Sequence, residues 1–105
     1  MNFDLSIKIL KEIQKEPSQS QRMLSKSCGV SLGSAHYCIK VLVEKGYVKL
    51  KNFRNAHNKL AYTYILTPSG MNHKKELAIS FLKRNQAEFE ALQKEIKSLE
   101  EDLAR

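Results

Sequence analysis

The hydrophobic and polar positions of residues 20–46 predict two short helices joined by a tight turn. Ser20 can cap a first helix of about two turns, and Gly29 can provide the left-handed residue that closes it. Ser31 can cap a second, longer helix that ends before Gly46. Apolar residues that share one face of this second helix are Ala35, Cys38, Ile39 and Leu42. Two helices joined by a turn that contains glycine form the helix-turn-helix pattern.

The opposite face of the second helix, which we assign to residues 31–45, is small, polar or basic. The candidate contact residues on it are Ser31, Gly33, Ser34, His36, Tyr37 and Lys40. The second helix of a helix-turn-helix enters the DNA major groove, where such side chains can reach phosphates and base edges. An ordinary amphipathic surface helix would have the same two faces. The rest of the chain therefore has to decide between these interpretations.

After Gly46 the period of the pattern changes from helix to strand. Residues 47–51 alternate apolar and basic, and residues 60–66 are aromatic and β-branched, which predicts a hairpin with a long polar tip. Residues 45–59 hold five Lys and Arg residues and no acid. A basic hairpin after a helix-turn-helix is typical of a winged helix. The candidate wing, residues 51–60, supplies three further contact residues: Arg54, Asn55 and Lys59. A solvated hairpin whose lysines prevent edge aggregation is the alternative.

Residues 3–15 form an apolar stripe that predicts a helix, started near Asp4 and stopped before Pro17, after a loose end at Met1 and Asn2. The stripe is wider than one small packing partner requires. We therefore expect this helix to have surplus apolar surface and to make a second contact.

A final helix is predicted from the cap Thr67 and Pro68 to the C-terminus, over 38 residues or roughly 57 Å. Its apolar residues repeat in alternating steps of four and three, which is a heptad seam. The seam residues expected to self-associate are Leu82, Phe89, Leu92, Ile96, Leu99 and Leu103, with Ala78 and Asn85 in the same series. The alternative is a helix folded back onto residues 3–15, which are too short to cover the seam. Acids that flank the seam, such as Glu95 and Glu100, disfavour a simple parallel pair.

Charge strengthens the nucleic-acid interpretation. The 105 residues carry a formal net charge of +7, with a pI near 9.5. Residues 1–85 contribute +10 and residues 86–105 contribute −3, so the basic part coincides with the helix-turn-helix. The sequence lacks an apolar run long enough for a membrane span and an N-terminal signal core, so we expect a cytoplasmic location and no membrane partner.

The residues that could carry other chemistry are few. Cys28 and Cys38 are expected to be reduced, small core residues, and a redox switch remains open if both meet at the packed face of the motif. His36, His57 and His73 lack the spacing of a zinc site. We find no nucleotide-binding, hydrolase or metalloprotease motif, so we expect no metal, no cofactor and no enzymatic activity.

Two segments resemble the small MarR-type winged-helix regulators associated with exopolysaccharide (EPS) gene clusters. They are VSLG…YC.K.L.EKG within residues 30–46 and NFRN…NKLAY.Y.LTP.G within residues 52–70, and the similarity extends over most of residues 4–100. The resemblance implies a dimeric DNA-binding transcriptional regulator linked to polysaccharide genes. Because the chain lacks the second long C-terminal helix of full-length MarR proteins, a small-molecule effector is not expected.

The sequence therefore predicts a mainly α winged-helix (α+β) fold: a helix, a helix-turn-helix, a two-stranded β wing and a long C-terminal helix. We assign residues 1–67 to DNA binding and residues 68–105 to dimerisation, with helix 3–15 contributing. The expected function is sequence-specific binding of double-stranded DNA by a homodimer at an inverted repeat. A winged-helix protein-interaction module that docks through the acidic C-terminal helix is the alternative.

Overall fold

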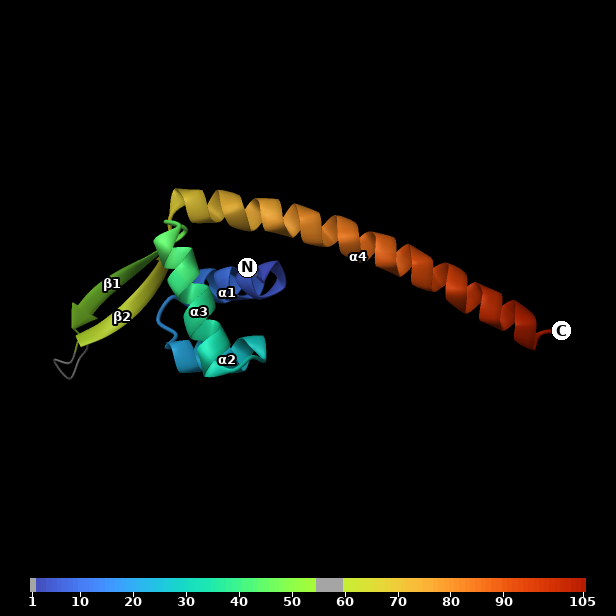
Figure 1. The fold of residues 1–105 in the computed structure, drawn as a ribbon, viewed down its shortest axis with the longest axis horizontal. Helices are drawn as coiled ribbons and strands as arrows, with labels where there is room; N and C mark the ends of the chain where they lie inside the picture. The colour runs from blue at the N-terminus through green and yellow to red at the C-terminus, as the bar shows by residue number, and fades with distance from the viewer. Residues whose placement is uncertain (1, 55–59) are drawn as a thin grey trace.

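The computed structural model of the chain describes residues 2–54 and 60–105. Its elements, in chain order, are α1 (Phe3–Lys15), α2 (Gln21–Cys28), α3 (Leu32–Glu44), β1 (Val48–Arg54), β2 (Leu60–Leu66) and α4 (Pro68–Leu103). The molecule measures 71 × 26 × 22 Å, because α4 extends far beyond the body formed by the other elements (Figure 1). The predicted fold class, mainly helical with one hairpin and a long C-terminal helix, is confirmed.

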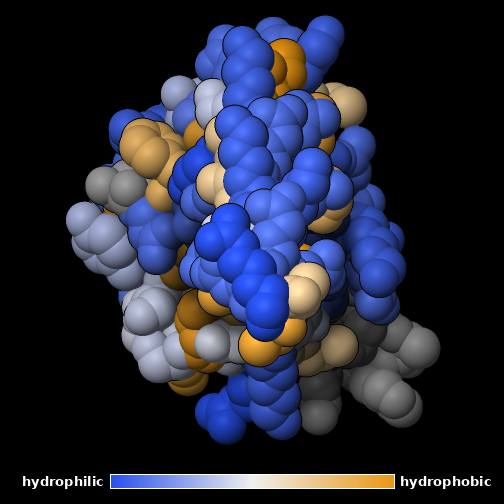
Figure 2. Space-filling view, turned by 90° about the vertical axis from the view of Figure 1, so that its right-hand side faces the viewer, coloured by the Kyte–Doolittle hydropathy of each residue, from blue (hydrophilic) through white to orange (hydrophobic). Residues whose placement is uncertain are grey.

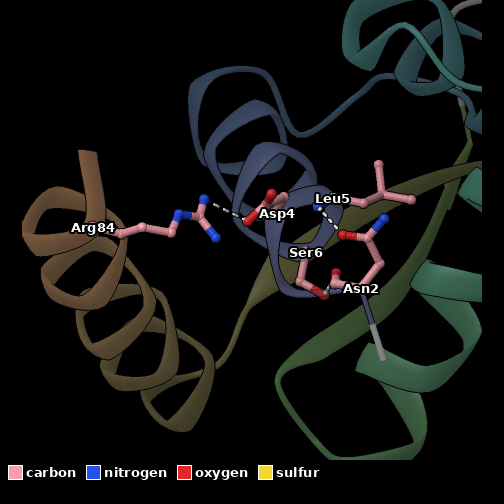
Figure 3. A network of polar contacts seen from close by, with 5 residues as sticks. All are labelled: Asn2, Asp4, Leu5, Ser6 and Arg84. Carbon is pink, nitrogen blue, oxygen red and sulfur yellow. Dashed lines mark hydrogen bonds and ion pairs between the residues drawn. The ribbon is translucent and has the colours of Figure 1, made fainter. Parts of the chain in front are cut away.

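The start of α1 is fixed by Asn2, which was expected to be a loose end. The Oδ1 atom of Asn2 accepts a hydrogen bond of 3.1 Å from the Leu5 amide, so Asn2 is the N-cap. Beside it, Asp4 forms an ion pair of 2.9 Å with Arg84 of α4 (Figure 3). Both side chains of this pair are about half exposed, so its contribution to stability is small, about 0–1 kcal/mol. The pair nevertheless marks how far α1 extends along α4.

The apolar stripe of α1 is used almost entirely within the monomer. Five of its residues are at most 6% exposed: Leu5, Ile7, Ile9, Leu10 and Ile13. The predicted surplus apolar surface is therefore wrong except at Phe3, which is 57% exposed. The reason is that α1 lies at the centre of the fold and contacts α2, α3, β2 and α4.

The two helices of the motif and the turn between them form as predicted. Ser20 accepts from the Met23 amide at 3.2 Å, and Gly29 closes α2 at φ 68°. Gly29 is therefore in the left-handed region that other residues avoid. Val30 packs against the core from the turn, and Leu24 and Leu42 are fully buried between α2 and α3.

The hairpin differs from the prediction in the length of its first strand. β1 begins one residue later than expected and continues to Arg54, because Asn52, Phe53 and Arg54 pair antiparallel with Tyr62, Ala61 and Leu60. These residues were assigned to a loop from their polarity. Ladder hydrogen bonds are made by the backbone, so polar residues extend a strand when a partner strand is present.

The base of the hairpin is joined to the first turns of α4. The Thr67 hydroxyl donates to the Gly46 carbonyl at 2.6 Å, and the Thr67 amide donates to the Tyr47 carbonyl at 3.1 Å. The Tyr47 ring stacks on His73 with a centroid separation of 4.1 Å. Gly70 is buried against the Tyr47 backbone. The hairpin and α4 therefore share one tightly packed joint.

The distal part of α4 leaves the body of the molecule. α4 has 36 residues, or about 54 Å of helix, and from Leu82 onward every residue is exposed. The six seam residues that we expected to self-associate are 54–87% exposed. Figure 2, seen from the side of the C-terminus, shows hydrophobic side chains among the hydrophilic ones that make up most of this face. The alternative, a helix folded back onto residues 3–15, therefore holds for the first turns of α4, which contact α1, and is wrong for its distal part.

Candidate nucleic-acid interface

The two faces of α3 are those that the sequence predicted. Ala35, Cys38, Ile39 and Leu42 are at most 4% exposed and face the core. The residues predicted to contact DNA from this helix are all exposed: Ser31, Gly33, Ser34, His36, Tyr37 and Lys40. The Tyr37 side chain is 65% exposed. One side of α3 is thus free along its whole N-terminal half.

Two of these residues have a structural role as well. The Ser31 hydroxyl oxygen accepts from the Ser34 amide at 3.1 Å and the hydroxyl donates to the Ser34 hydroxyl at 3.0 Å. Ser31 is therefore the N-cap of α3. The N-terminus of a helix has free amide groups and a partial positive charge, so it attracts phosphate.

His36 is held in place by a chain of polar contacts that the sequence did not reveal. Its Nδ1 lies 2.9 Å from Oε1 of Gln21, and Nε2 of Gln21 donates to the Tyr64 hydroxyl at 3.1 Å. Because an amide oxygen can only accept, Nδ1 of His36 is the donor in this contact. The chain connects α3, α2 and β2. Residues so far apart in sequence give no local signal of such a contact.

The electrostatic surroundings of α3 are almost free of acids. Between Glu16 and Glu76 the sequence contains ten Lys and Arg residues and a single acid, Glu44. Lys40, Lys45, Lys49 and Lys51 are exposed on α3, on the turn after it and on β1, which contacts α3. This distribution produces a positive field beside the exposed face of the helix.

The predicted wing residues are covered only in part. Arg54 ends β1 opposite Leu60, and the structure describes its backbone alone. Asn55 and Lys59 lie outside the described residues. The described part of the hairpin carries Lys49 and Lys51, both exposed, toward this end.

The two cysteines lie on the buried side of the motif. Both are free, and burial raises the pKa of each thiol above its usual value. A hydrogen bond from Ser6, whose hydroxyl lies 3.6 Å from the Cys38 sulfur, opposes the shift of the pKa of Cys38. Their placement matches the prediction of small core residues. Over residues 2–54 and 60–105, no three His, Cys, Asp or Glu side chains cluster as a metal site would require.

The comparison with known families agrees with this geometry. Residues 3–49 match the model of a family described as winged helix-turn-helix DNA-binding. This match and the order of the elements agree on a winged-helix fold. In the described part of the chain, no helix has both the length and the apolar character needed to cross a membrane.

Solved structures share the fold at low sequence identity. A PadR-like transcriptional regulator from Bacillus cereus matches with a TM-score of 0.75 and 19% identity, covering 85% of this chain and 91% of that one. The PcaV transcriptional regulator from Streptomyces coelicolor matches with a TM-score of 0.69 and 19% identity, covering 95% of this chain and 70% of that one. A MarR-family regulator from Silicibacter pomeroyi matches with a TM-score of 0.63 and 14% identity, covering 82% of this chain and 56% of that one.

At such identities these likenesses establish the winged-helix fold, which the PadR-like and MarR-family proteins share. No curated protein sequence matches the chain. The EPS-associated subfamily therefore rests only on the motifs described above.

Proposed function

We propose that the chain is a sequence-specific DNA-binding transcriptional regulator. In this proposal α3 enters the major groove and the hairpin β1–β2 lies beside it against the DNA backbone. The observation that carries the proposal is the exposed polar face of α3, opposite a fully buried apolar face and surrounded by lysines. A helix of this kind in a winged helix-turn-helix domain fits the groove, and the lysines replace counterions on phosphates.

The roles of the residues follow from their positions on the domain. Ser34, His36, Tyr37 and Lys40 meet base edges, because they occupy the free face of α3. Ser31 and Gly33 lie at the N-terminus of α3, where the backbone can approach a phosphate. The wing residues Arg54, Asn55 and Lys59 contact the sugar-phosphate backbone or the minor groove.

We also propose that the regulator acts as a homodimer on an inverted repeat. Residues 1–67 then bind DNA, and residues 68–105 pair the two copies, with α1 contributing through Phe3, which stays exposed in the monomer. The exposed seam of α4 supports this division, since a row of apolar side chains left in water favours association. A dimer also doubles the number of base pairs that are read.

The motifs shared with EPS-associated MarR-type regulators extend the proposal to control of polysaccharide genes. A cytoplasmic location and the lack of catalysis are part of the same proposal. Similarity to regulators supports it, and the acid-poor surface around α3 favours DNA over other partners.

The experiment that tests the proposal is the replacement of Lys40 by Ala. We expect roughly 10-fold weaker binding to a duplex selected from random DNA, because one well-placed base or phosphate contact contributes about 1–3 kcal/mol. The free energy of unfolding should change by less than about 0.5 kcal/mol, since Lys40 is exposed. Fluorescence anisotropy gives the affinity and urea unfolding the stability.

The matched control is Lys97→Ala, which removes the same charge from the exposed distal part of α4. It should leave the affinity for DNA almost unchanged. Equal affinities of the wild type and Lys40→Ala would show that α3 does not present this face to DNA.

A second variant, Arg54→Ala, tests the wing. If Arg54 contacts a phosphate, affinity should fall by a similar factor on many sequences, and the slope of log K against log salt should become shallower by about one unit. Titrations at several salt concentrations measure this slope. A loss restricted to duplexes with particular bases would instead indicate that Arg54 reads a groove.

A further inference from the structure

The two halves of α4 carry opposite charges. Residues 68–85 hold four basic residues and one acid, for a net charge of +3, and residues 86–105 hold six acids and three basic residues, for −3. The basic half packs against α1, whereas the acidic half extends beyond the body (Figure 1). The two halves of α4 are therefore complementary in charge.

Both halves carry the same apolar seam. In the distal half it consists of Phe89, Leu92, Ile96, Leu99 and Leu103, all more than half exposed. In the proximal half it continues through Met71, Ala78 and Leu82, which are exposed as well. The seam is therefore open from one end of α4 to the other.

A groove lies along the proximal seam. It has a volume of about 410 Å³ and is lined by Gln14 of α1 together with Met71, Asn72, Lys74, Lys75 and Ala78 of α4. Two of its lining residues, Met71 and Ala78, are seam positions, and two others are lysines. An apolar helix with acidic edges is the complement of this surface, and the distal half of α4 has both properties.

We propose that two copies of the chain pair their α4 helices antiparallel, with the distal half of each helix in the groove of the other copy. This inference rests on the proposed homodimer and adds its geometry. A parallel pair would place the +3 halves together and the −3 halves together, whereas the antiparallel pair places each basic half beside an acidic half. The helix dipoles favour the same orientation.

The heptad positions agree with this orientation. In an antiparallel pair the a residues of one helix face the d residues of the other. The a positions of the seam are Leu82, Phe89, Ile96 and Leu103, and the d positions include Ala78, Asn85, Leu92 and Leu99. Phe89 then fits opposite Ala78 of the second copy, so the largest seam residue meets the smallest. The same alignment brings Glu95 beside Lys74 of the second copy and centres the pair near Leu82 and Asn85. A parallel pair would place Glu95 beside Glu100 of the second copy.

The substitution Glu95→Lys separates the two orientations. In the antiparallel dimer this change replaces the attraction to Lys74 of the second copy with a repulsion, twice per dimer. The dissociation constant of the dimer should therefore rise roughly 10-fold. In a parallel dimer the same change would remove a repulsion and strengthen the dimer. Sedimentation equilibrium of the full chain measures the dissociation constant. The control Glu101→Lys changes the same charge on the face away from the seam and should have little effect.

A distance between the two copies gives an independent answer. Spin labels are attached at Asp102→Cys in a chain whose buried cysteines carry Cys28→Ala and Cys38→Ala, with circular dichroism to confirm folding. The antiparallel pair predicts a label separation of about 55 Å, from 1.5 Å of rise per residue on either side of the centre. A parallel pair predicts less than about 20 Å, since paired helix axes lie about 8–10 Å apart.

These outcomes distinguish the two proposals. A separation of about 55 Å, with a weaker dimer for Glu95→Lys, supports the antiparallel arrangement. A dimer with any shorter separation, or one strengthened by Glu95→Lys, overturns the arrangement and leaves the proposed homodimer intact. A chain that remains monomeric at micromolar concentration overturns both.

Discussion

Replacing Leu92 and Ile96 together by Glu is expected to convert the dimer into a monomer. Both side chains are exposed in the monomer, at 55% and 54%, and would be buried only against a second copy. Burying such a side chain contributes about 1.5–3 kcal/mol, and four of them per dimer are replaced by carboxylates, for which leaving water is costly. The dissociation constant should therefore rise about 1,000-fold or more, as measured by light scattering over a concentration series.

DNA binding should weaken with dimerisation, because a monomer reads a single half-site. The matched control is Ala91→Glu with Ser98→Glu, which adds the same charge on the same turns of α4 but outside the seam. The control should remain a dimer. If the seam variant also dimerises and binds its operator normally, the seam is not the interface.

A substitution at the joint between the hairpin and α4 is expected to reduce stability strongly. In Gly70→Ala, the added Cβ would lie 2.8 Å from the carbonyl carbon of Tyr47 and closer still to its oxygen. This carbonyl cannot easily move, since it accepts from the Thr67 amide at 3.1 Å. Overpacking against backbone costs about 3 kcal/mol, so the melting temperature should fall by more than about 10 °C.

Gly33→Ala is the control for this experiment. Gly33 lies in α3 with nothing within 4 Å of an added Cβ, and alanine favours a helix over glycine by up to about 1 kcal/mol. Its melting temperature should be unchanged or higher. Equal melting temperatures for Gly70→Ala and the wild type would show that Gly70 and Tyr47 are not in close contact in solution.

The joint also connects assembly to recognition. Thr67 and His73 of the α4 end contact Gly46 and Tyr47, which lie directly after α3 and before β1. The orientation of α4 therefore determines the orientation of the hairpin and the recognition helix. Because α4 pairs the copies in our proposal, the dimer geometry would determine the spacing of the half-sites.

Local sequence patterns were sufficient for most of the fold. The end of α1, the bounds of α2 and the start of α4 follow from caps and stops that act within one turn, such as Ser20, Gly29 and Thr67. The face of α3 that is free for DNA follows from helical periodicity, because an apolar face has to be buried. In each case residues close in sequence carry the signal.

The features that the sequence did not reveal depend on contacts between distant residues. The hydrogen-bond chain from His36 through Gln21 to Tyr64, and the stack of Tyr47 on His73, form only after α2, the hairpin and α4 have come together. The same holds for the end of β1, which its partner strand extends. The surplus apolar surface predicted for α1 was wrong because one stripe cannot show how many elements surround it.

The most direct test of the account is the molar mass of the complex formed with a selected duplex. The account predicts two chains on one duplex that carries an inverted repeat, with half-site centres about 34–36 Å apart or a multiple of this distance. Affinity should fall steeply with salt and should be much lower for a duplex of scrambled sequence. A complex of one chain per duplex, or equal affinity for the selected and scrambled duplexes, would contradict it.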